Sequence, residues 1–274
     1  MTAARDADLQ RFDDIVALQP AGDGVFTHDL DGSRTNLLGT LYGGYTMAVT
    51  LQALAAATPG REMVSATCQF IRTLPAERAT IAVDDIRVGR SVAVKSAECR
   101  VGDRLGVRAT ALFTPMPADG GTWDDPPPAL PPIADCVDPF ERGGLALPFM
   151  WPATLRVPPD VEEHLVAGTG DRPEAVAWSG YGDEVGLTGP RLAGLADRFV
   201  PPPWLLGQHV GLLTLELSFH LLRPGVTGWL ATRFATPTIG TDLVTLESTY
   251  WDDRGRVVAT ARQIARPMPV DGLG

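Results

Sequence analysis

The segment LYGGYTMAVTLQAL, residues 41–54, constrains the fold more than any other part of the chain. Met47, Leu51 and Leu54 recur at helical spacing, which predicts a buried helix that begins near two glycines and ends at Pro59-Gly60. Four short β-rich runs separated by Gly, Asp and Arg turns follow it: 64–71, 81–88, 92–101 and 105–113. A single helix followed by an antiparallel meander predicts an α+β unit in which the sheet curves around the helix.

The second half of the chain repeats this order. A strand is predicted over 174–181 and a helix over 189–199, followed by strands over 212–222, 229–236, 243–251 and 256–264. Setting Arg72 against Arg223 brings the two units into register. Between them the chain is rich in proline, which blocks both helix and central strand. We therefore expect an N-terminal unit over 1–115, a stiff linker over 116–159 and a C-terminal unit over 160–274.

Charge and composition exclude several classes of function. The net charge of −10 argues against nucleic-acid binding, which requires a basic surface. No apolar run is long enough to span a membrane, and the N-terminal residues lack the apolar stretch of a signal peptide, so we expect a cytoplasmic protein. The sequence contains no HExxH motif, no phosphate-binding glycine loop and no GxSxG nucleophile elbow. Neither a metal nor another cofactor is predicted.

At the level of whole segments the sequence resembles a known family. The segments LYGGYTMAVTLQAL, VSATCQFIRTLPAERATIAVDDIRVGRSVAVKSAECRVGDRLGVRATALF and LTLELSFHLLRPGVTGWLATRFATPTIGTDLVTLESTYWDDRGRVVATARQIA look like the two halves of a thioesterase II-type acyl-CoA thioesterase, more narrowly its actinobacterial branch. The resemblance covers about residues 20–115 and 175–267. It implies a double hotdog: two antiparallel sheets, each wrapped around a central helix and packed as a pseudo-dimer.

The resemblance also implies an activity and a site. Members hydrolyse fatty or other acyl-CoA thioesters with an activated water, which an Asp, a Thr or Ser and a Gln of the second hotdog hold. Counted back from Arg223-Pro224, the acidic position falls on Glu216, with Glu in place of Asp. The glutamine falls on Gln263 and the hydroxyl on or near Thr236, with Thr238 as the alternative. The implied substrate is an acyl-CoA or acyl-carrier thioester.

The residues themselves support one composite site. Alternation along 213–221 places Thr214, Glu216, Ser218 and His220 on a polar strand face. In the same register Ser65 stands in the place of Glu216 and Ala111 in that of Gln263, so the polar pair occurs in one half only. The first half would instead supply backbone N–H groups at the helix start, from Gly43, Gly44 and Tyr45, to bind the thioester oxygen.

Each of these residues also has a purely structural interpretation. The glycines would then only allow close packing, and Glu216 and Gln263 would be exposed strand residues. Asp197 is an alternative base, although a carboxylate at the end of its helix opposes the macrodipole and is expected to bond to the adjoining loop. Arg87 and Arg90 are candidates for binding the phosphates of CoA.

Two other classes of function stay open. His220 beside Glu216 leaves open a dehydratase- or hydratase-like lyase, and a non-catalytic acyl-binding module is a third class. Further pairing of sheet edges would give a homo-oligomer.

Overall fold

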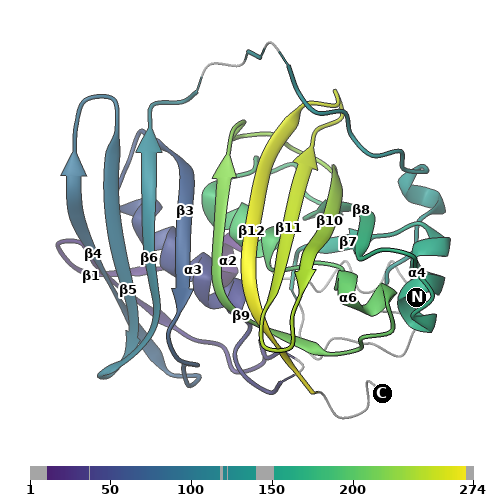
Figure 1. The fold of residues 1–274 in the computed structure, drawn as a ribbon. Helices are drawn as coiled ribbons and strands as arrows, with labels where there is room; N and C mark the ends of the chain where they lie inside the picture. Colours follow the sequence, from purple (N-terminus) through teal and green to yellow (C-terminus); the bar gives the residue numbers. More distant parts are fainter. Residues whose placement is uncertain (1–10, 37, 118–119, 122, 140–150, 270–274) are drawn as a thin grey trace.

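The computed structural model describes residues 11–36, 38–117, 120–121, 123–139 and 151–269. Its dominant element is one 12-stranded sheet in the order β1-β2-β4-β5-β6-β3-β9-β12-β11-β10-β8-β7 (Figure 1). Every neighbouring pair of strands is antiparallel. Within the described residues, no helix is long and apolar enough to cross a membrane.

The first half of the sheet holds the predicted meander. Its elements are α2 (Phe12–Ile15), β1 (Gln19–Gly22), β2 (Val25–Asp29), α3 (Gly43–Ala56), β3 (Glu62–Phe70), β4 (Arg78–Val88), β5 (Ala93–Val101) and β6 (Arg104–Thr114). The helix α3 is buried on most sides, from Met47 through Leu54, which explains why its apolar residues are not confined to one stripe. The predicted helix and the strands that follow it are confirmed to within a few residues at their ends.

The second half has the same order of elements. It contains η1 (Ile133–Asp135), β7 (Thr154–Arg156), α4 (Pro159–Ala167), β8 (Glu174–Gly180), α5 (Gly189–Ala196), α6 (Pro202–Leu205), β9 (Gly211–Leu221), β10 (Leu230–Ile239), β11 (Val244–Trp251) and β12 (Val257–Met268). The spatial order β8-β10-β11-β12-β9 matches β2-β4-β5-β6-β3 of the first half. The repeat seen in the sequence is therefore a repeat of topology.

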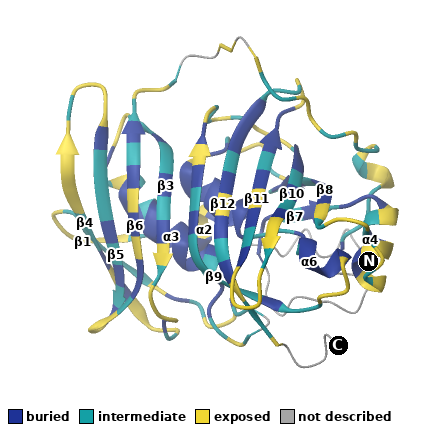
Figure 2. Ribbon diagram, in the orientation of Figure 1, coloured by how far each residue is buried: buried dark blue, intermediate teal, exposed yellow. Residues whose placement is uncertain are grey.

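The two halves meet at β3 and β9, which pair antiparallel from Ser65↔His220 to Gln69↔Glu216. Here the structure differs from the prediction of two separate sheets, because this ladder makes the sheet continuous. The helices α3 and α5 lie side by side on one face of it, and a buried cluster that contains both spans the two halves (Figure 2). Burial of this shared apolar surface, together with the β3–β9 ladder, holds the halves together.

The proline-rich region is more ordered than a simple linker. Part of the predicted linker over 116–159 forms β7, which pairs with β8 at the sheet edge, and Trp151 is buried in the core. Further upstream the Arg223 guanidinium donates to both carboxylate oxygens of Asp124, at 3.0 and 3.1 Å. These contacts fix the extended segment to the second half. Residues 140–150 lie outside the described residues.

Candidate active site

The start of α3 is bonded to a carboxylate from the other half of the chain. Tyr42 is the N-cap of α3 and offers no side-chain cap, so the first N–H groups of the helix need another acceptor. Asp197, the C-cap of α5, supplies one: its Oδ2 accepts from the N–H of Gly44 at 2.6 Å. A carboxylate at this position also lies at the positive end of the α3 macrodipole, which favours its charged form.

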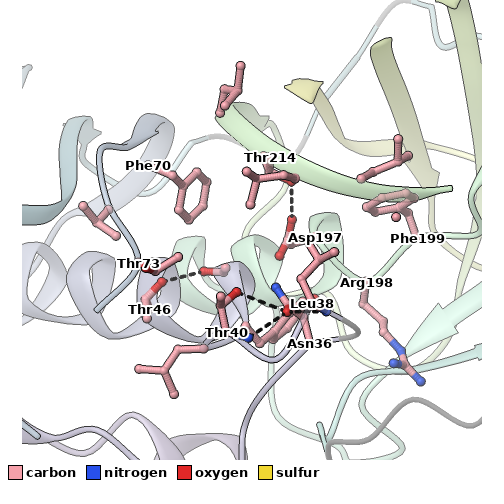
Figure 3. Close-up of a pocket in the computed structure, with 18 of the residues that line it drawn as sticks. Asn36, Leu38, Thr40, Thr46, Phe70, Thr73, Asp197, Arg198, Phe199 and Thr214 are labelled. Carbon is pink, nitrogen blue, oxygen red and sulfur yellow. Dashed lines mark hydrogen bonds between the residues drawn. The ribbon is translucent and has the colours of Figure 1, made fainter. Parts of the chain in front are cut away.

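Two side chains of the sheet complete a polar cluster around Asp197. Thr214 Oγ1 on β9 lies 3.2 Å from Asp197 Oδ1 (Figure 3). The same Oγ1 lies 2.9 Å from Gln263 Oε1 on β12. A hydroxyl carries a single proton, so it donates to one of these partners at a time. The amide orientation that turns Nε2 of Gln263 toward Thr214 satisfies both contacts, since Thr214 then accepts from Gln263 and donates to Asp197.

A β-bulge turns Thr214 into the site. In the ladder between β9 and β12, Leu217 pairs with Gln263, Glu216 with Ile264 and Thr214 with Ala265. Leu215 is thus the extra residue of a bulge, and the alternation of strand faces changes phase there. As a result Thr214 faces inward on the same side as Gln263, whereas Glu216 faces the opposite side.

Asp197 and Thr214 of this cluster line a pocket of about 290 Å³ at the junction of the two halves (Figure 3). Its walls are mostly apolar, from Leu38, Leu41, Phe70 and Leu74 of the first half and Phe199, Trp204, Leu212 and Leu213 of the second. Asn36 braces the loop that forms one wall, since its Oδ1 accepts from the backbone N–H groups of Leu38 and Thr40. An apolar pocket with a few convergent polar groups is the usual form of a small-molecule site.

Burial changes the acidity of the carboxylate. Asp197 is only 8% exposed, and removal from water raises its pKa to about 6, against the opposing effects of the Gly44 and Thr214 hydrogen bonds. A carboxylate with a pKa near 6 is ionised at neutral pH and still accepts a proton readily, which suits a general base. Gly43 permits the close approach, because a Cβ there would lie 3.1 Å from Asp197 Oδ2.

The N-terminus of α5 corresponds in the second half to the N-terminus of α3. It is closed, in the sense that neighbouring side chains occupy it. Its N-cap Thr188 accepts the N–H of Arg191, and Pro190 has no N–H to offer. Met63 fills the remaining space: a Cβ on Gly189 would lie 2.5 Å from its sulfur. Met63 is also the residue before the bulge of β3, as Thr214 is in β9, and Ala111 stands in the place of Gln263.

The structure separates two of the residues predicted to form the catalytic group. Glu216 accepts a hydrogen bond from Gln69 Nε2 at 3.2 Å on the outer face of the sheet, away from Gln263. Thr236 is buried on β10, and β11 lies between it and Gln263 on β12. The predicted grouping of Glu216 and Thr236 with Gln263 is therefore not what the fold produces. Strict alternation does not indicate the bulge at Leu215, which brings Thr214 next to Gln263.

The remaining candidates are distributed as follows. Asp197 does not bond to the adjoining loop as predicted, since it reaches α3 in the other half. His220 is exposed on β9, beyond Glu216 and Ser218. Arg87 and Arg90 lie at the end of the β4–β5 hairpin, and β5, β6 and β3 separate β4 from β9. None of these three lines the pocket among the described residues. Within the same residues, no group of three His, Cys, Asp or Glu side chains is placed to hold a metal.

Solved structures with this fold are hotdog proteins. A candidate thioesterase II from Thermobifida fusca is 24% identical, with a TM-score of 0.83 over 96% of this chain and 99% of that one. A hot dog fold protein from Alicyclobacillus acidocaldarius is 21% identical, with a TM-score of 0.81 over 94% and 98%. The acyl-CoA thioesterase II TesB2 from Mycobacterium marinum is 18% identical, with a TM-score of 0.74 over 96% and 100%. These likenesses define the class of fold as hotdog.

Sequence comparison defines the family. The family model of the acyl-CoA thioesterase N-terminal domain matches residues 32–114, and that of the C-terminal domain matches residues 114–266. The chain therefore belongs to the acyl-CoA thioesterase family and is a thioesterase. Comparison with curated protein sequences gave no match.

Proposed function

We propose that the chain hydrolyses acyl-CoA thioesters with a water held by Asp197, Thr214 and Gln263. The observation that carries this proposal is the short bond between Asp197 and the N–H of Gly44, inside an apolar pocket. The candidate base is thus hydrogen-bonded directly to the N-terminus of a helix. The three side chains also have the types that the family resemblance implies, an Asp, a Thr and a Gln, in that order along the chain.

The proposed reaction follows from these positions. Asp197 takes a proton from the water as the water oxygen attacks the thioester carbon, while Thr214 and Gln263 orient that water. The first N–H groups of α3 have no acceptor within the helix. The N–H of Gly44 is bonded to Asp197, so those of Gly43 and Tyr45 would stabilise the oxyanion. The tetrahedral intermediate then expels the CoA thiolate, which recovers the proton from Asp197. Acid and free CoA are the products.

The halves of the molecule support a finer description of the fold. We interpret them as two hotdog units, residues 1–115 and 160–274, packed as a pseudo-dimer. The equal strand orders and the antiparallel contact between β3 and β9 support this interpretation, because a two-fold axis through that contact would exchange the halves. The catalytic group then lies at one of two related positions along the α3–α5 contact.

The proposal is tested by thiol release from a panel of acyl-CoAs with Asp197→Asn and, as the matched control, Glu216→Gln. Both changes replace a carboxylate by an amide of similar shape. We expect Asp197→Asn to lower kcat by about 10²-fold or more, the usual contribution of a general base. Glu216→Gln should stay within about twofold, since its partner Gln69 lies on the outer face. Loss of turnover in Glu216→Gln, or full turnover in folded Asp197→Asn, would overturn the assignment.

A further inference from the structure

The active-site pocket and a smaller cavity in the second half share one wall, the side chain of Phe199. On one side this ring lines the active-site pocket of about 290 Å³. On the other it lines a second cavity of about 10 Å³, which has room for about one water molecule. The apolar residues that line the second cavity come from α5 and the sheet: Ala196, Leu217, Phe234, Leu246 and Ala261. Its polar lining comes from β11 and β12: Glu247, Ser248, Arg262 and Gln263.

The ring of Phe199 is supported from the second-cavity side. It packs against the buried cluster that contains Phe234 and also against the cluster that contains Leu246. Gln263 lines the same cavity, and its amide bonds to Thr214 in the main pocket. The catalytic group and Phe199 therefore form one partition between the pocket and the apolar space under the sheet.

The pocket extends in two directions from Asp197. Phe70 and Phe199 stand on opposite sides of the Asp197–Thr214 pair (Figure 3). The Phe70 side continues to Arg72 and Thr73 at the end of β3, where Arg72 is exposed to solvent. The Phe199 side ends against buried apolar side chains. Arg198 also lines the pocket beside Phe199, and its guanidinium points away from Asp197 (Figure 3). The first direction thus ends at an exposed arginine, and the second ends against apolar side chains.

A thioester of CoA has two unlike arms, a hydrocarbon chain and a long polar arm that ends in phosphates. Burial favours the hydrocarbon in the direction that ends against apolar side chains, and charge favours the phosphates near exposed arginine. We propose that the acyl chain points toward Phe199 and that the Phe199 ring is the end wall that limits its length. This inference rests on the proposed thioesterase function.

Removal of the ring should extend the acyl direction. In Phe199→Ala the pocket and the second cavity become one space, lined by Phe234, Leu246 and Leu217. Each methylene that enters this apolar space would favour binding by up to about fourfold. The optimum should move to longer chains, because a chain too short to reach the new space gains nothing and loses contact with the ring. In Phe199→Trp the optimum should move the other way.

The experiment measures kcat/KM for acetyl-, butyryl-, hexanoyl-, octanoyl-, decanoyl- and palmitoyl-CoA by thiol release. We expect the ratio of long to short substrates to rise about tenfold or more in Phe199→Ala and to fall in Phe199→Trp. Opposite shifts in the two variants separate a wall from general damage to the fold. The matched control is Phe70→Leu on the other side of Asp197, which should change all substrates by a similar factor.

The outcomes distinguish the two proposals. Suppose that the wild type releases thiol and that Phe199→Ala and Phe199→Trp keep its order of chain-length preference. This result would overturn the acyl-wall assignment and leave the thioesterase function intact. A change of chain-length order in Phe70→Leu instead would assign the acyl chain to the opposite direction. Absence of thiol release by the wild type from every acyl-CoA would overturn the proposed function itself, and the assignment with it.

Discussion

The two central helices begin in closely related settings, yet only one start is chemically available. At α3 the N-cap Tyr42 supplies no side-chain bond, and Asp197 from the other half approaches Gly44. At α5 the N-cap Thr188 accepts an N–H from its own helix, and Pro190 removes another. The difference between an open and a closed helix start is thus set by a few residues in each first turn.

The side chains around the two helix starts also differ in how they fill space. At the closed start Met63 and the buried Arg191, which bonds to Asp183 at 2.5 Å, fill the space with packing and an ion pair. At the open start Thr214 occupies the position of Met63 and leaves a pocket. One end of the helix pair is filled by packed side chains, and the other opens into the pocket to which we assign the reaction.

The largest effects are expected from the equivalent pair Met63 and Thr214. Met63→Ala should lower the free energy of unfolding by about 2–5 kcal/mol, because it leaves a cavity against Gly189. Turnover per folded molecule should be unchanged, since the closed start takes no part in the reaction. Urea unfolding together with thiol release checks this prediction. A loss of turnover per folded molecule would contradict it.

Thr214→Val should give the reverse result. It removes the hydroxyl that links Asp197 to Gln263, so we expect turnover to fall by about 10- to 100-fold, with rescue by Thr214→Ser. The apparent pKa of the reaction should also rise, because the Thr214 hydrogen bond lowers the pKa of Asp197. A pH–rate profile of both variants distinguishes this role from a packing role, which would leave the profile in place.

Titration of Asp197 should affect rate and stability in opposite directions. With a pKa of about 6, the fraction of active base falls about tenfold per pH unit below pH 6, and kcat should follow it. The unfolded carboxyl keeps its ordinary pKa of 3.8, so between pH 4 and 6 the folded protein holds the proton more tightly. Its contribution to the free energy of unfolding therefore falls by up to about 3 kcal/mol as the pH rises through this range, and is constant above it.

Asp197→Asn is the variant that isolates this contribution. Its side-chain oxygen can still accept from Gly44, but it does not ionise. We expect the variant to lose the rate dependence near pH 6 and to unfold at higher urea concentration than the wild type at pH 8. Equal stability of the two proteins at pH 8, together with a wild-type rate that does not change between pH 5 and 7, would contradict the raised pKa.

The smallest effects are expected from the first glycine of each helix. A Cβ at position 43 would press on the Asp197 carboxylate by a few tenths of an ångström, and Gly43→Ala should lower kcat by roughly tenfold with little change in stability. A Cβ at position 189 would overlap Met63, so Gly189→Ala should cost about 1–3 kcal/mol of stability and leave kcat in place. Loss of kcat in both variants, or loss of stability in both, would contradict the difference between the two helix starts.

Most of the fold was predictable from local pattern. The apolar spacing of Met47, Leu51 and Leu54 predicted α3, and alternation with turn residues predicted β3–β6 of the first half and β8–β12 of the second. The short edge strand β7 was not predicted, because the prolines around it favour a linker interpretation. Pairing of β3 with β9 joins segments distant in sequence, which no local pattern reveals.

The site was only partly predictable. The sequence placed Gln263 and the glycine start among the candidates, and the lack of a polar pair in the first half was visible from Ser65 and Ala111. Strict alternation predicts that Thr214 and Glu216 share one strand face. A single bulged residue, Leu215, instead brings Thr214 to the side of Gln263 and leaves Glu216, the base predicted from the sequence, on the opposite side. Asp197 was given low weight because its own helix disfavours it. The helix that binds it, α3, lies in the other half of the chain.

The hydrogen bond between Gly44 and Asp197 also affects how the molecule folds. Gly44 and Asp197 are 153 residues apart, so their contact has a high loop-closure cost and should form late. While the chain is being synthesised, the first half emerges with β3 as an unpaired edge, which is prone to aggregation. Arrival of β9 covers that edge in the same step that brings Thr214 to the start of α3. Catalytic competence would therefore appear only when the vulnerable intermediate has disappeared.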